Sequence, residues 1–178
     1  MRRRAVMIRA GLVTIAAASL SVASAAAAQE EGSRPTREFV AAAAQSDAFE
    51  TLEAQTALTQ SANPQVRAYA EHMLRDHAET SRMLQQATAR SGLMPPPPGL
   101  NAEQASLLGA LQSLKGQDFD QAYFRQQAIG HHSALTAEQR YARSGDDPAV
   151  RQVAVAATPV IAAHLSEAER LQAATGAP

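Results

Sequence analysis

The chain of 178 residues contains no cysteine, no tryptophan and only seven aromatic residues. Without cysteine there is no disulfide, no lipid-modified cysteine anchor and no thiolate metal site. Any metal ligand must then be a histidine, a carboxylate, a methionine or a backbone carbonyl. Few aromatic residues together with abundant alanine favour helices that pack closely through small side chains over a β-sandwich.

Positive charge gathers at the amino terminus. Four arginines within the first nine residues precede an apolar stretch, Ala10 to Ala23, and a run of small residues that ends at Ala28. A basic start, a short apolar middle and an Ala-x-Ala-like end are typical of a secretory signal peptide. We expect residues 1–28 to be cleaved before Gln29, because the apolar stretch is short for a membrane-spanning helix. An uncleaved membrane anchor is the alternative.

Removal of residues 1–28 leaves twelve basic and seventeen acidic residues, a net charge of −5. A mildly acidic domain without a basic stripe is a poor nucleic-acid binder, because contacts to phosphate supply most of that affinity. Export predicts a periplasmic protein without a membrane span, associated with the envelope at most through an unidentified protein partner. About 150 residues suit a single domain with its own core. We expect a flexible segment over 29–35 and one helical-bundle domain over 36–174.

Four long segments and one short segment carry the helical period, and turn signals separate them. Asn63-Pro64 and Asp147-Pro148 provide a capping side chain followed by proline in the first turn of a helix. The proline run after Met94 predicts an extended connector. The pattern predicts an all-α fold of two antiparallel helical hairpins, joined by a Pro-rich crossing and a short extra helix. The expected helices are Thr36–Ser61, Pro64–Ser91, Ala102–Leu114, Asp118–Ser144 and Asp147–Ala174.

Three of the five histidines, His77, His131 and His164, lie on apolar helix faces, whereas His72 and His132 lie off them and are expected in solvent. Residues equally far from the turn of a hairpin lie at the same height. Glu50 and His77 are each thirteen residues from the first turn, and His131 and His164 are each sixteen from the second. The hairpins differ by three residues, about 4.5 Å of helix rise. The sequence therefore predicts that one glutamate and three histidines meet in the core.

Such side chains need partners when they are buried. Three histidines and a carboxylate suit a divalent transition metal such as zinc, iron or copper. The alternative is a set of structural polar residues that hydrogen-bond one another or the backbone. Glu53 can replace or support Glu50, and Glu167 is either a further ligand or a solvated residue. Asp76, about 100° around the helix from His77, is expected to hydrogen-bond a neighbouring helix.

Several signatures of catalysis do not occur in the sequence. It has no Glu-x-x-His, the pair that di-iron carboxylate bundles place on two helices, and no glycine-rich phosphate loop. These absences favour a non-enzymatic protein over an enzyme. Two functions are favoured: a periplasmic metal-binding protein for storage, buffering or stress protection, or a non-catalytic envelope interaction protein whose polar core fixes helix register. A third is a small hydrolase or redox enzyme that uses the metal, and it requires an open coordination position.

A series of motifs resembles one known family. These are Ser46-Asp47-Ala48-Phe49-Glu50, Asn63-Pro64-x-Val66, Ala70-x-x-Met73-x-x-Asp76-His77, Asp118-Phe119-Asp120-x-x-Tyr123, Gln127-x-x-x-His131-x-x-Ala134 and Pro159-x-x-x-x-His164-Leu165. Over Phe39 to Leu171 the chain resembles the bacterial exported domain-of-unknown-function family DUF4142. The resemblance implies a ferritin-like four-helix bundle and recurring polar positions at Glu50, His77, His131 and His164. It implies no activity, and the outer-membrane label often given to the family disagrees with the lack of barrel strands.

Overall fold

The computed structural model describes residues 32–96 and 99–176, and these residues form five α-helices and no strand. The all-α prediction is therefore confirmed. Each helix begins and ends within two residues of its expected position. The predicted signal peptide, residues 1–28, lies outside the described residues. The helices are α2 (Arg34–Gln60), α3 (Pro64–Arg90), α4 (Ala102–Ser113), α5 (Gly116–Ser144) and α6 (Pro148–Gly176).

Side-chain caps explain where the helices start. The Asn63 side chain accepts a hydrogen bond from the backbone N–H of Gln65 at 3.0 Å, and Pro64 opens α3 as expected. Ser33 caps α2, which therefore begins at Arg34, inside the segment predicted to be flexible. Gly116 starts α5 with φ of +56°, a conformation that residues with a Cβ rarely adopt. Local chemistry thus sets the helix boundaries.

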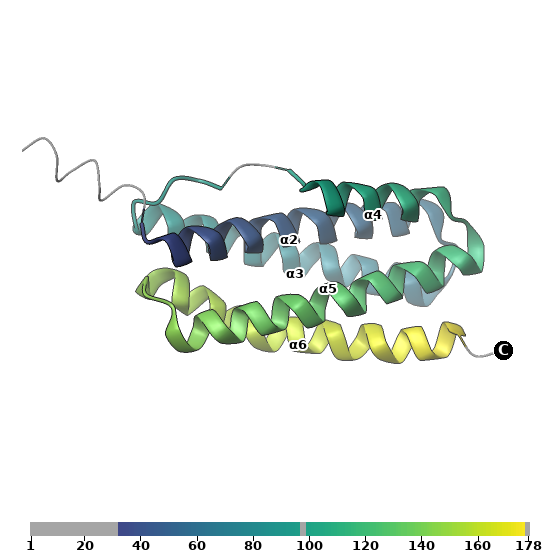
Figure 1. Cartoon of the computed structure of the whole chain (residues 1–178). Helices are drawn as coiled ribbons and strands as arrows, with labels where there is room; N and C mark the ends of the chain where they lie inside the picture. Colours follow the sequence, from purple (N-terminus) through teal and green to yellow (C-terminus); the bar gives the residue numbers. More distant parts are fainter. Residues whose placement is uncertain (1–31, 97–98, 177–178) are drawn as a thin grey trace, which may run out of the picture.

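The four long helices lie side by side, and α4 lies along one flank (Figure 1). Helices α2 and α3 form one antiparallel hairpin, and α5 and α6 form the other. Helices α3 and α5 point in the same direction (Figure 1). Helix α3 packs on α6, and α2 packs on α5. The four long helices consequently enclose one shared interior.

The interior contains two apolar clusters separated by polar side chains. One cluster includes Tyr69, Met73 and Tyr123, and the other includes Phe39 and Tyr141, whose rings stack with centroids 4.0 Å apart. The polar residues between them come from all four long helices and are buried: Asp47, Glu50, Glu53, His77, Thr80, Gln127, His131, Glu138 and His164. We call this set the polar layer. Because buried polar groups are costly without partners, their contacts indicate what the layer does.

Helix α6 continues through Pro159, which costs one backbone hydrogen bond without ending the helix. Within the described part of the chain, α6 is the one helix that is long and apolar enough to cross a membrane, judged by length and composition over Pro148–Thr175. A core helix can meet the same criteria. Here α6 packs against α5 and α3 and carries His164 into the polar layer.

Candidate metal centre

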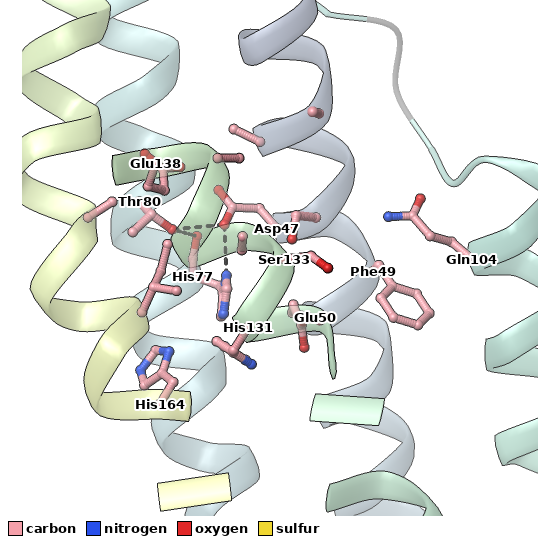
Figure 2. Close-up of a pocket in the computed structure, with 18 of the residues that line it drawn as sticks. Asp47, Phe49, Glu50, His77, Thr80, Gln104, His131, Ser133, Glu138 and His164 are labelled. Carbon is pink, nitrogen blue, oxygen red and sulfur yellow. Dashed lines mark hydrogen bonds and ion pairs between the residues drawn. The ribbon is translucent and has the colours of Figure 1, made fainter. Parts of the chain in front are cut away.

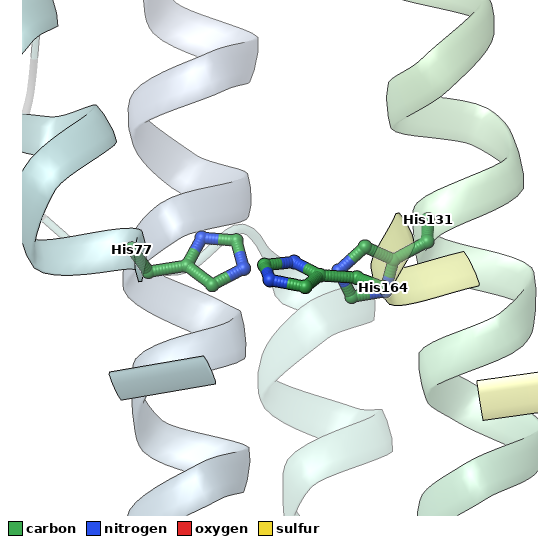
Figure 3. Close-up of side chains that lie close together, drawn as sticks. All are labelled: His77, His131 and His164. Carbon is green, nitrogen blue, oxygen red and sulfur yellow. The ribbon is translucent and has the colours of Figure 1, made fainter. Parts of the chain in front are cut away.

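Three histidines from three helices meet in the polar layer. His77 of α3, His131 of α5 and His164 of α6 are 5%, 1% and 1% exposed. Their ring centroids are 5.2–5.9 Å apart. One nitrogen of each ring lies within 4.8 Å of the corresponding nitrogens of the other two, and Figure 3 shows the rings facing one another. The prediction that these histidines lie at one height is confirmed.

Each ring is held by a hydrogen bond at its other nitrogen. His77 Nδ1 is 2.7 Å from Asp47 Oδ1, and His131 Nδ1 is 2.8 Å from the carbonyl oxygen of Gln127. His164 Nε2 is 2.9 Å from Asp76 Oδ2. A carbonyl oxygen only accepts, so His131 must donate from Nδ1, and carboxylates favour the same role for His77 and His164. An imidazole oriented by a carboxylate or carbonyl is the usual arrangement of a metal-binding histidine.

The second nitrogens of these three rings have no hydrogen-bond partner. They are His77 Nε2, His131 Nε2 and His164 Nδ1, all three buried. A neutral imidazole that donates through one nitrogen carries a lone pair on the other nitrogen, which therefore cannot donate. Burial lowers the pKa of His131 to about 3, and burial also lowers the pKa of His164. Both rings are therefore neutral near pH 7, the form in which imidazole binds metals.

Glu50 lies apart from this group of three nitrogens. The Gln127 side-chain amide donates to Glu50 Oε2 and, at 2.7 Å, to Glu53 Oε2. Burial and the neighbouring carboxylate raise the pKa of Glu50 well above its ordinary value, and burial raises the pKa of Glu53 to about 8. Glu50 Oε1 approaches the backbone of Gly130 so closely that a Cβ there would lie 2.8 Å away. Gln127 thus bridges two buried carboxyl groups, both with raised pKa values, beside the histidines.

A cavity of about 590 Å³ leads to the histidines between α2 and α5 (Figure 2). Small residues of these two helices line it, among them Ala42, Ser46, Gly130 and Ala134, because side chains of this size leave the gap unfilled. At its α4 side the lining includes Leu107, which is 39% exposed. The three histidines and Glu50 share this space, so a small ligand has room beside them.

The structure adds residues that the sequence patterns did not single out as a site. Asp47 holds His77 and also accepts hydrogen bonds from Thr80 and, at 2.8 Å, from Ser81. Asp47 precedes Glu50 by three residues, so the two acids lie on one face of α2, and this shared face could have indicated Asp47 as a site residue. The sequence patterns also did not single out Gln127, although it lies on the same helix face as His131. Asp76 bonds a neighbouring helix as predicted.

Comparisons with known proteins agree with this fold. A family model described as "Domain of unknown function (DUF4142)" matches residues 21–171. The crystal structure of a DUF305 fragment from Deinococcus radiodurans is similar, with a TM-score of 0.70 and 18% identity over 80% of this chain and 98% of that chain. At that identity the likeness concerns the fold alone. Among the curated proteins none matches.

Proposed function

The chain belongs to the DUF4142 family of domains of unknown function, and from its polar layer we propose that it is a metal-binding protein. In this proposal His77, His131 and His164 hold one divalent transition metal, such as zinc, iron or copper, inside a ferritin-like four-helix bundle. The protein is exported to the periplasm and stores or buffers the metal there, or protects the envelope from it.

The observation that carries the proposal is the set of three unpartnered nitrogens. A buried polar atom without a hydrogen bond is costly, and here three such nitrogens belong to histidines that lie together in the core. A cation between these nitrogens removes that penalty. The nitrogens, within 4.8 Å of one another, need only small side-chain rotations to reach the usual metal–nitrogen distance of about 2.0–2.1 Å.

The surrounding charges support a dication. Asp47 and Asp76 each hold the outer nitrogen of a ligating ring, so two carboxylates compensate the charge of the ion through the imidazoles. Three protein ligands leave a fourth position, and the cavity provides room for water or a small ligand there. Glu50 lines the same cavity. Its role as a further ligand stays a prediction.

The test compares two adjacent histidines of α5. Untagged protein is purified, and zinc, iron, copper and manganese are quantified per chain for the wild type, His131→Gln and His132→Gln. His132 is exposed and outside the cluster, so its variant is a matched control. We expect the control to retain the wild-type metal content and His131→Gln to hold one ion fewer per chain. Equal metal content in the two variants, or no metal in the wild type after reconstitution, contradicts the proposal.

A further inference from the structure

The outer side of the His164 ring faces a second group of ligand atoms. Its Nδ1 points into the buried cluster, whereas its Nε2 is 2.9 Å from Asp76 Oδ2. The same Asp76 oxygen is 3.1 Å from Nε2 of His72, and the rings of His72 and His164 meet edge to face with centroids 5.3 Å apart. These three ligand atoms lie within 4.8 Å of one another. His72 and Asp76 are partly exposed where α3 and α6 meet, whereas His164 is buried.

We propose that His72 Nε2, Asp76 Oδ2 and His164 Nε2 form a second site for a divalent transition metal, back to back with the buried site through the His164 ring. The sharing of His164 rests on the proposed function, but His72 belongs to this site alone. We call it the outer site.

The helices place these groups in a way that suits an ion. His72 and Asp76 are one turn apart on α3, so both side chains lie on one helix face. Glu167 follows His164 by three residues on α6, and its Oε2 is 3.6 Å from His72 Nδ1. A carboxylate thus lies near the Nδ1 side of the ring while Nε2 faces Asp76, and carboxylates beside the second nitrogen are common for metal-bound histidines. Two imidazoles and a carboxylate suit zinc or copper(II), and water completes the coordination.

The experiment measures zinc bound per chain, after dialysis against a fixed free zinc concentration, for the wild type and three histidine variants. We expect two ions in the wild type and in the exposed control His132→Gln, and one ion in His72→Gln and in His77→Gln. Because His72 is half-exposed, its variant is expected to fold, and circular dichroism checks this. The comparison of zinc content in His72→Gln and His132→Gln decides whether the outer site exists, even if His77→Gln does not fold.

The outcomes separate the two sites. If the wild type binds one ion, and His72→Gln retains it while His77→Gln loses it, the outer site is overturned and the buried site is supported. If the wild type binds one ion, and His72→Gln loses it while His77→Gln retains it, the outer site is supported and the buried site is contradicted. If neither the wild type nor any variant binds zinc, both proposed sites are overturned, and the His72–Asp76–His164 contacts are an ordinary ion-pair network.

Discussion

Replacement of Gln127 by methionine should destabilise the fold, and increasingly so as the pH rises. Its side-chain amide is the donor to both Glu50 and Glu53, and it is fully buried. Methionine has a similar size but cannot donate, so two buried carboxyl oxygens lose their hydrogen bond. A lost hydrogen bond with a stranded acceptor costs about 1–3 kcal/mol, and the two share one donor, so we expect a total loss of about 2–4 kcal/mol. In a domain of this size that loss corresponds to a Tm lower by roughly 4–16 °C.

The pH dependence follows from the pKa shifts. The Gln127 hydrogen bond lowers the pKa of both glutamates against the opposing effect of burial. Without it both folded-state pKa values rise further above their unfolded values. Stability falls with pH wherever the folded state binds more protons than the unfolded state. The deficit of Gln127→Met should therefore be larger at pH 9 than at pH 5.

Urea unfolding followed by circular dichroism at both pH values measures this deficit. The exposed Gln139 on the same helix gives the matched control Gln139→Met, for which we expect less than about 0.5 kcal/mol of change. A Gln127→Met protein as stable as the wild type at pH 9, or one whose deficit is larger at pH 5, would refute the reasoning.

Three further predictions concern single residues. In the wild type the pKa of Glu53 is raised from 4.5 to about 8, so the free energy of unfolding falls as the pH rises between these values. Urea titrations of Glu53→Gln should show a flatter dependence of this free energy on pH. An unchanged dependence would count against the raised pKa. Asp47→Asn removes the carboxylate that holds His77, so zinc affinity measured with a competing chelator should fall about 10–100-fold, and unchanged affinity would disprove its orienting role. Asn63→Ala should cost about 1 kcal/mol in thermal unfolding whereas Asn63→Asp retains the cap, and equal losses would show that the cap is not the cause.

The helices were predictable because their signals are local. Asn63-Pro64 and Asp147-Pro148 mark helix starts through side-chain caps, and the Asp147 side chain does accept from the N–H of Val150 at 2.9 Å. The start of α2 was missed by two residues because Ser33, which lies outside the apolar pattern, supplies the cap. Periodicity detects the buried face of a helix but not the residue that precedes it.

The three histidines were predictable for a geometric reason, and their partners were not. Distance from a turn gives the height of a residue in a hairpin, which placed His77, His131 and His164 together. The side-chain direction of Glu50 depends instead on its contact with Gln127 across the bundle, and that pairing leaves no trace in spacing along the chain. For the same reason Asp47, one turn away, was overlooked as the partner of His77.

A crystal structure of the zinc-loaded chain, with anomalous data collected at the zinc edge, shows whether an ion lies between the three buried histidines. We expect an anomalous peak about 2.0–2.1 Å from His77 Nε2, His131 Nε2 and His164 Nδ1, with any fourth ligand on the cavity side. Such a map also shows whether Glu50 reaches the ion. Loaded crystals with no peak between these three nitrogens would contradict the account and leave the histidines as structural residues of the polar layer.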